Sequence, residues 1–384
     1  MVATPPKLFT PVRLGGRTHA LTLQHRVAMP PLSRLRTGDA GVQPDFGVKY
    51  YEQRATRGGL IIAEATNISA TARGFYGAPG IFTQEQIDAW KPITQAVHDK
   101  GGVIFLQLWH TGRISHPSLQ PNGELPVSAS STLPLDGTRA TITKDGPQPL
   151  VRPRALETHE IPGICEDYRQ AAVNAIAAGF DGVELHASTG QLPEQFLFDG
   201  MNDRTDKYGG SVENRARFLF EALEAILQSL ESSQVGVRLS PYSKSCKQQD
   251  SDPAATTRYV FTKLNDYDLA YAHVVEPRDF HYESELTPPQ GATAFIRSLY
   301  KGVLITASGY DRESAMEAVE KGIADIVAIG RYFISNPDLV RRFQLNAKLT
   351  PFDRATFYTP GEAGYTDYPC LDEPHAVLME HTTP

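Results

Sequence analysis

Short runs of apolar and β-branched residues alternate along nearly the whole chain with longer stretches in which apolar residues recur every three or four positions. This alternation is typical of a parallel sheet covered by helices. It predicts eight strands, at residues 26–29, 59–66, 103–109, 182–186, 235–239, 270–275, 303–306 and 325–329. Helices are predicted between them, among others at residues 84–100, 164–179, 212–230 and 312–322. Eight strand and helix units predict an α/β fold that closes as a (β/α)₈ barrel, known as the TIM barrel.

Two segments depart from the repeating unit. Residues 12–14, the glycine pair at 15–16 and the stretch from Arg17 onward predict a β-hairpin that caps the bottom of the barrel. Residues 111–160 are rich in Pro, Ser, Gly and Thr and far longer than a usual connection, which predicts a lid over the barrel mouth. No change of composition divides the chain, so residues 1–384 are expected to form one domain that contains this insertion.

Composition and charge narrow the classes of function. A formal charge of -7 with no long basic run argues against nucleic acid and anionic membranes as partners. No stretch approaches the roughly 18 apolar residues of a membrane span, and the first residues lack a signal-peptide core, so a cytoplasmic protein is expected. Cys165, Cys246 and Cys370 form no C-x-x-C pair, which indicates neither a disulfide framework nor a metal site.

Polar residues fall where a barrel performs its chemistry, at the C-terminal ends of the strands. They are Gln107 with Trp109 (third strand), His186 (fourth), Arg238 (fifth), Ser308 with Gly309 (seventh) and Gly330 with Arg331 (eighth). Taken singly, a Gly-Arg pair is more often a turn and a lone histidine more often a structural residue. Together, glycines that let backbone amides approach a phosphate and an arginine that can pair with it predict a phosphorylated cofactor.

Several motifs of the chain resemble, in the same order, those of the old yellow enzyme family of FMN-dependent ene reductases. They are RVAMPPLSR at 26–34, EAT at 64–66, QLW at 107–109, QFL at 195–197, NDRTDKYGGS at 202–211, GR at 330–331 and GYTDYP at 364–369. The similarity runs from about Leu8 to Pro369. It implies FMN as the cofactor, NAD(P)H as the reductant and the activated C=C bond of an α,β-unsaturated carbonyl as the target.

The resemblance also implies roles for individual residues. FMN would be held by Pro31, Leu32, Ser33, Ala65, Gln107, Arg238, Ser308, Gly309, Gly330 and Arg331. The substrate would be bound by Trp109, His186, Thr189 and Tyr365. His186 and Thr189 would donate hydrogen bonds to its carbonyl, although the family usually has Asn or His where Thr189 stands.

Gln191 stands where the family usually has the tyrosine that protonates the α-carbon of the substrate. An amide cannot act as an acid near neutral pH, whereas a phenol has a pKa of about 10. Three other proton sources are open: water held by Gln191, Tyr365 at the mouth, or a tyrosine of the lid. Gln191, Thr189, His186 and Tyr365 are therefore the predicted catalytic set.

Alternative functions follow from the same departure. Some fungal members that make specialised metabolites lack this tyrosine, so desaturation, isomerisation or assistance to a cyclisation is an alternative to reduction. A noncatalytic flavin-binding protein is a second alternative. A flavin-free lyase or isomerase would need a lysine at a strand end, and the eight predicted strands contain none. The partner is expected to be a small molecule, and the protein a monomer or a homodimer.

Overall fold

Eight parallel strands close into a barrel in the computed structural model, which describes residues 5–15, 21–133, 140–244, 250–278 and 284–371. In barrel order they are β3 (Val27–Met29), β4 (Leu60–Asn67), β5 (Val103–Trp109), β10 (Gly182–Ala187), β11 (Val235–Leu239), β12 (Tyr271–Val275), β13 (Leu304–Ala307) and β14 (Ile326–Ala328). The barrel closes where Val327 of β14 pairs with Val27 of β3. The predicted (β/α)₈ fold is confirmed, and each strand boundary lies within one residue of its prediction.

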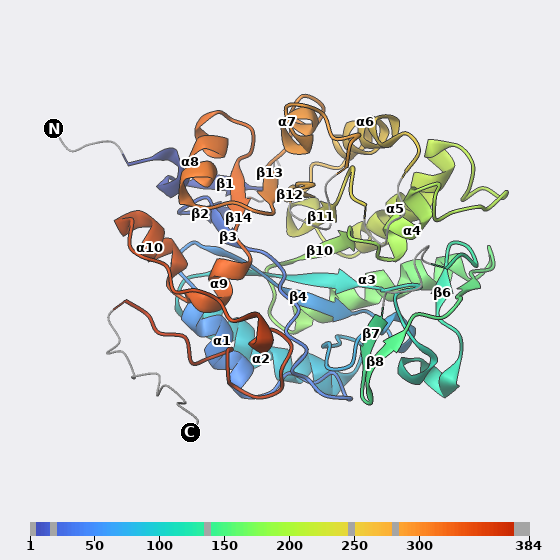
Figure 1. Ribbon diagram of the computed structural model, residues 1–384, viewed down its shortest axis with the longest axis horizontal. Coiled ribbons are helices and arrows are strands. Elements are labelled where there is room, and N and C mark those ends of the chain that lie inside the picture. Colours follow the sequence, from blue (N-terminus) through green and yellow to red (C-terminus); the bar gives the residue numbers. More distant parts are fainter. Residues whose placement is uncertain (1–4, 16–20, 134–139, 245–249, 279–283, 372–384) are drawn as a thin grey trace, which may run out of the picture.

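Helices surround this barrel (Figure 1). They are α1 (Phe46–Arg54), α2 (Gln84–Asp99), α3 (Ile161–Ala177), α4 (Leu192–Leu197), α5 (Val212–Leu227), α6 (Pro253–Leu264), α7 (Ala292–Arg297), α8 (Arg312–Glu320), α9 (Arg331–Ser335) and α10 (Leu339–Leu345). Ser211 caps α5 by accepting a hydrogen bond from the Asn214 N–H, and Thr83 forms a capping box with Gln86 at α2. Because helices cover its outer face, all eight residues of β4 are buried.

The predicted N-terminal hairpin is formed by β1 (Val12–Leu14) and β2 (Leu21–Leu23), while its turn, residues 16–20, lies outside the described residues. The Gly15 N–H donates to the carbonyl of Ala270, the residue before β12 begins. Leu14 and Leu23 pack with apolar side chains inside the barrel, among them Leu60 at the start of β4. The hairpin therefore covers the N-terminal ends of the strands, away from the ends where chemistry is expected.

The insertion at residues 111–160 contains more structure than the predicted loop. Its elements are the 3-10 turns η3 (Pro117–Leu119) and η4 (Pro121–Gly123), the parallel pair β6 (Val127–Ser128) and β9 (Arg154–Ala155), and the hairpin β7 (Ala140–Thr143) with β8 (Gly146–Pro149). Arg113 and Ser128 are fully buried, so much of the insertion packs on the barrel. Residues 134–139 are outside the described part, and a lid function stays a prediction.

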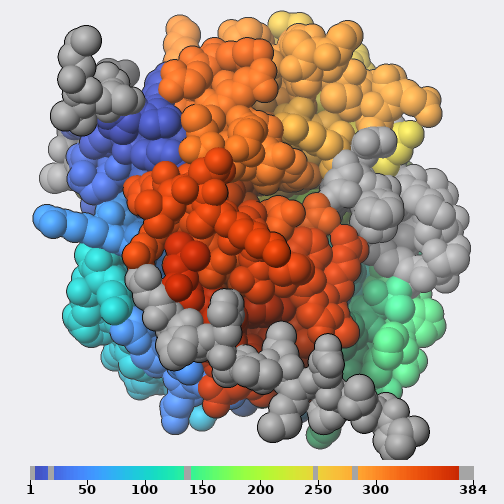
Figure 2. Space-filling model, turned by 60° about the vertical axis from the view of Figure 1, so that its left-hand side comes forward, coloured from blue at the N-terminus to red at the C-terminus, as the bar shows by residue number. Residues whose placement is uncertain are grey.

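Residues 351–371, the last part of the chain that the structure describes, lie on the barrel. Figure 2 shows this part of the chain, in red and orange-red, spread over the centre of one face of the molecule. The guanidinium of Arg34 donates to the carbonyls of Phe357 and Gly364, which ties this segment to the residues after β3.

Further 3-10 turns are η1 (Lys7–Phe9), η2 (Ala70–Ala72), η5 (Ser232–Gln234) and η7 (Arg354–Thr356). None of the described helices has the length and apolar character needed to cross a bilayer.

Candidate active site

A cavity of about 1030 Å³ opens at the C-terminal ends of the barrel strands. Sites for small molecules and cofactors typically enclose roughly 300–1,000 Å³, so a cofactor and a second reactant can share this one. Its lining includes the predicted residues Pro31, Leu32, Ser33, Ala65, Gln107, Trp109, His186, Thr189, Gln191, Arg238, Ser308, Gly309, Gly330 and Arg331. Residues up to 300 positions apart in sequence thus face one space.

The loops after β13 and β14 form one end of the cavity. Ser308 and Gly309 both adopt left-handed backbone conformations, with φ of 91° and 68°. Such a conformation is strained for serine, and strained backbone of this kind is concentrated at ligand sites. At Gly330 a Cβ atom would come within 3.3 Å of Leu32 Cδ2, so glycine keeps this wall thin. These loops fit a phosphate group, with Arg331 on the same wall.

A buried hydrogen-bonded network lies beneath the middle of the cavity. Gln107 Nε2 donates to Glu184 Oε1 over 2.7 Å, and Glu184 Oε2 is 2.8 Å from His273 Nδ1. Because its NH₂ group is committed to Glu184, the Gln107 amide can offer its oxygen to a ligand N–H. Arg238 lines the same region and supplies a positive charge. An acceptor beside a cation suits the pyrimidine edge of a flavin, which carries an N–H and becomes electron-rich on reduction.

His186 stands on the wall formed by β10. Its ring lies 6.3 Å from that of Trp109, which in turn stacks on Phe75 at 5.5 Å. His186 Nδ1 is 3.1 Å from the hydroxyl oxygen of Ser188. Burial, helped by the positive charge of Arg238, lowers the pKa of His186 well below its usual 6.5, so the ring is neutral near pH 7.

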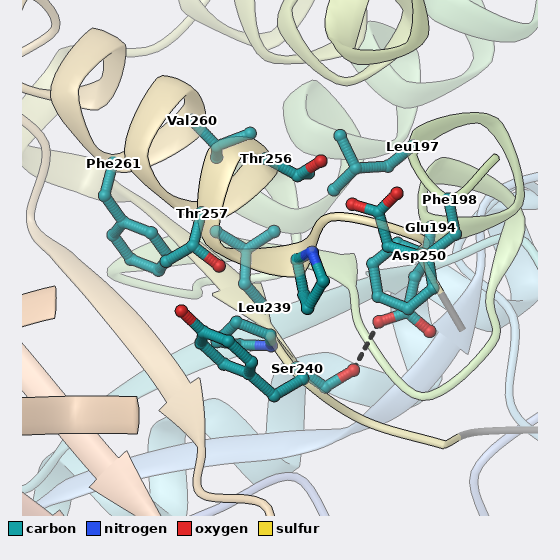
Figure 3. Close-up of a pocket in the computed structure, with 13 residues that line it drawn as sticks. Glu194, Leu197, Phe198, Leu239, Ser240, Asp250, Thr256, Thr257, Val260 and Phe261 are labelled. Atoms are coloured by element: carbon teal, nitrogen blue, oxygen red, sulfur yellow. Dashed lines mark hydrogen bonds between the residues drawn. The ribbon is translucent and has the colours of Figure 1, made fainter. Parts of the chain in front are cut away.

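The turn after β10 presents Thr189 to the cavity in a left-handed conformation, with φ of 55°, followed by Gly190 with φ of 85°. Glu194, at the start of α4, holds this turn. Its Oε2 accepts a hydrogen bond from the Gly190 N–H at 2.5 Å, and its Oε1 accepts one from the Ser240 hydroxyl group. The Ser240 oxygen in turn accepts a hydrogen bond from the Thr189 N–H at 2.7 Å. Figure 3 shows Glu194 and Ser240 joined by this hydrogen bond, beside a second cavity of about 20 Å³, large enough for one water molecule.

Gln191 ends this turn and is held against it. Its Nε2 lies 3.4 Å from the carbonyl oxygen of Thr189, and its Oε1 is buried without a hydrogen bond from any described residue. Because a carboxamide is not acidic near neutral pH, Gln191 cannot supply a proton to a substrate in the cavity.

The prediction that Tyr365 lies at the mouth is wrong. Its ring is fully buried, stacked on that of Tyr50 at 3.9 Å, with the guanidinium groups of Arg34 and Arg36 at 5.1 and 4.5 Å from its centroid. Cation–π attraction and burial hold it behind the wall of the cavity, which it does not line. The tyrosine of this segment that does line the cavity is Tyr358, which is 56% exposed. A lid tyrosine is excluded as well, since residues 111–160 contain none.

Sequence reasoning also missed the apolar part of the lining. Among its members are Leu35 and Phe75, Ala140 and Ile142 on β7, Tyr310 and Tyr332, and Phe352 and Phe357 in the C-terminal segment. The density of aromatic residues at 352–358 was the only available signal. Glu194 and Ser240 had no signal, because they lie 46 residues apart and meet only in the folded chain.

The chain is similar to a known family of flavin enzymes over most of its length. Residues 7–349 match the model of the NADH:flavin oxidoreductase / NADH oxidase family. The chain belongs to this family. Over 368 residues it is 48% identical to 12-oxophytodienoate reductase 1 of Oryza sativa subsp. japonica, covering 95% of this chain and 93% of that protein. Over 366 residues it is 43% identical to 12-oxophytodienoate reductase 2 of Arabidopsis thaliana, covering 95% and 96%.

Solved structures agree with this membership. Morphinone reductase superposes with a TM-score of 0.90 at 46% identity, covering 98% of this chain and all of that one. The old yellow enzyme homologue from Zymomonas mobilis gives 0.89 at 40% identity, covering 95% and 99%. The resemblance to the old yellow enzymes is therefore confirmed, and this family member is an FMN-dependent oxidoreductase that uses NAD(P)H.

Proposed function

We propose that this enzyme reduces the C=C bond of an α,β-unsaturated carbonyl compound, which binds against His186 and Thr189. The observation that carries the proposal is that these two side chains share one cavity with the phosphate loops at Ser308 and Gly330. The names of the similar 12-oxophytodienoate and morphinone reductases support a substrate of this kind.

We propose a place for each part of FMN among the residues that line the cavity. Ser308, Gly309, Gly330 and Arg331 would hold the phosphate, and Gln107 and Arg238 the pyrimidine edge. Pro31, Leu32, Ser33 and Ala65 would line the ring. When bound, FMN supplies the two-electron chemistry between NAD(P)H and the second substrate. Arg238 stabilises negative charge at the pyrimidine edge.

Two donors polarise the substrate carbonyl in this proposal. A neutral His186 donates one hydrogen bond, and the Thr189 hydroxyl donates the other. The left-handed turn fixed by Glu194 holds Thr189 at the cavity. Trp109, stacked between Phe75 and His186, contributes an apolar wall for the substrate.

We propose that the α-carbon receives its proton from water, with the phenol of Tyr358, which also lines the cavity, as the alternative donor. Gln191 is not an acid, and Tyr365 is buried behind the cavity wall. Water is a weak acid, so protonation is expected to be slower than in a tyrosine-bearing relative. A second candidate function, motivated by the same departure at Gln191, is desaturation of a saturated carbonyl compound. Water would then accept the α-proton, FMN would take up the two electrons, and dioxygen or a second enone would take them from the flavin to complete the turnover.

Anaerobic half-reactions test the proposal. Purified protein should be yellow, and NADH or NADPH should bleach the flavin absorbance. 2-Cyclohexenone should then restore it with formation of cyclohexanone. Protein that binds no FMN on titration would refute the proposal. Oxidised protein that is bleached by cyclohexanone, with release of the enone, would favour desaturation instead.

We further propose a single domain over residues 1–384, a lid at 111–160, a cytoplasmic location, a role in specialised metabolism and a monomeric or homodimeric state. A freely diffusing small molecule is the expected partner.

A further inference from the structure

Ser188 lies two residues after His186 and is fully buried next to the imidazole. Its hydroxyl oxygen is 3.1 Å from His186 Nδ1, and this is its one hydrogen bond in the described structure. A buried hydroxyl group whose proton has no acceptor destabilises the folded protein. The Ser188 O–H therefore donates its hydrogen bond to Nδ1.

The direction of this hydrogen bond determines the state of the ring. A neutral imidazole carries one proton, and the nitrogen that accepts a hydrogen bond is the unprotonated one. When Nδ1 accepts from Ser188, the proton must be on Nε2. His186 lines the main cavity and Nε2 bonds no described residue, so this N–H is free to meet a ligand.

The charges around His186 make the tautomer matter. Burial disfavours the imidazolium most strongly, and the titratable neighbours Arg238 and His273 act in the same direction. A doubly protonated ring, which would donate from either nitrogen, is thus suppressed by burial and by these neighbours. Thr189, the other donor, has a hydroxyl that must also satisfy its own oxygen. Donation to a carbonyl therefore depends strongly on the proton at Nε2.

We propose that Ser188 is a positioning residue that fixes the Nε2–H tautomer of His186, so that a neutral imidazole donates to the substrate carbonyl. The inference rests on the proposed function for the carbonyl, but the tautomer itself is a property of the protein. Ser188 touches neither the flavin nor the carbonyl; it acts through His186.

Nitrogen NMR of the oxidised holoenzyme reads the tautomer directly. Protein labelled with ¹⁵N in its histidine rings is compared with Ser188→Ala and Ser188→Cys, and the His186 signals are assigned by their loss in His186→Gln. The wild type should show a protonated Nε2 and an unprotonated Nδ1 shifted by an accepted hydrogen bond. Ser188→Ala should lose that shift and gain the second tautomer, while the weak S–H donor of Ser188→Cys should restore part of it.

Binding of 2-cyclohexenone to the oxidised holoenzyme, followed by flavin absorbance, is the second readout. Loss of one neutral hydrogen bond should weaken binding about fivefold to tenfold in Ser188→Ala, with an unchanged Kd for FMN. Ser233→Ala removes another buried serine hydroxyl, in η5 before β11 at the opposite end of the barrel, and is the matched control.

The outcomes separate the two claims. A protonated Nδ1 in the wild type, or His186 shifts that do not change in Ser188→Ala, would overturn the role of Ser188 while the proposed function stands. Holoenzyme that binds no enone at all would instead overturn the proposed function, whichever tautomer the spectra show.

Discussion

At the scale of single residues, Gln191 is the departure with the largest chemical effect. A tyrosine at this position would place a phenol at the end of the turn that presents Thr189 to the cavity. We expect Gln191→Tyr to raise the rate of 2-cyclohexenone reduction by at least about tenfold, because a positioned general acid typically contributes 10²–10⁴. Steady-state turnover with saturating NADPH measures the change.

Gln191→Phe is the matched control for this substitution. It adds the same ring without the hydroxyl group, so a gain seen in both variants would come from packing and would contradict a role in proton transfer. Reduction of the flavin by NADPH should be similar in all three proteins, since no proton donor is required there.

At the scale of an element, the turn between β10 and α4 depends on one buried carboxylate. Glu194 accepts from the Gly190 N–H and from Ser240, and α4 itself begins one residue after Gln191. In Glu194→Gln one oxygen remains as an acceptor, but the other is replaced by an NH₂ group. That NH₂ group would point a donor at another donor, either the Gly190 N–H or the Ser240 hydroxyl group. Loss of a hydrogen bond to a charged group should lower the free energy of unfolding by about 1.5–3 kcal/mol.

Enone affinity should fall in the same variant, because Thr189 loses its support, while the Kd for FMN should stay constant. Chemical denaturation and flavin titration measure the two effects. Glu313→Gln, at a side chain that is 70% exposed, is the control and should match the wild type. An enone Kd equal to that of the wild type would show that the turn keeps its shape without Glu194.

The C-terminal segment is a second element that distant residues hold in place. Arg36 donates to the carbonyls of Thr356, Phe357, Gly361 and Ala363. Burial, reinforced by the charge of Arg34, lowers the pKa of Arg36 to about 10, which still leaves it charged near neutral pH.

Arg36→Lys keeps the charge but has three donors on one nitrogen instead of a planar fork, so it cannot reach all four carbonyls. Hydrogen exchange of amides in residues 352–366 should then become faster by a factor of at least about five, corresponding to one lost hydrogen bond. Arg154→Lys, at a half-exposed residue of the insertion, should leave this segment unchanged. Unchanged exchange in Arg36→Lys would show that the stack of Tyr50 on Tyr365 suffices.

At the scale of the whole molecule, buried neutral histidines make stability depend on pH. Burial lowers the pKa of His25 to about 4 and that of His110 to about 3. Below pH 6.5 the unfolded chain binds protons that these folded histidines do not, so stability falls as pH decreases. Each histidine should lower the free energy of unfolding by about 2 kcal/mol when the pH falls from 7 to 5. Asp250 acts in the opposite sense, because burial raises its pKa to about 6.

His110→Asn isolates one of these contributions, since an asparagine oxygen can still accept from the Gly112 N–H as His110 Nδ1 does. The difference in unfolding free energy between pH 7 and pH 5 should shrink by about 2 kcal/mol. Denaturant unfolding followed by tryptophan fluorescence at both pH values measures it. His159→Gln, at an exposed histidine, should keep the full difference, and a full difference in His110→Asn would contradict the assignment.

Local patterns along the chain were enough to predict the barrel, because each strand and helix carries its own periodicity and its own ends. The glycines at 309 and 330 and the polar residues at strand ends could likewise be assigned to one mouth, since parallel strands bring their C-terminal ends to the same side. The position of the Tyr365 ring could not be predicted from such local patterns. Motif order placed it near the site, but whether a ring in a C-terminal segment faces the cavity or the barrel depends on Tyr50, Arg34 and Arg36.

The sequence by itself determined the fold, the family and the absence of an acidic side chain at position 191, because these follow from residue identity and from spacing along the chain. Only the tertiary structure decided that Glu194 and Ser240 hold the turn of Thr189, that Tyr358 rather than Tyr365 lines the cavity, and that Ser188 meets His186 Nδ1. Each of these depends on the direction of a side chain. That direction is set by hydrogen bonds and packing within the folded molecule, often between residues far apart in the chain.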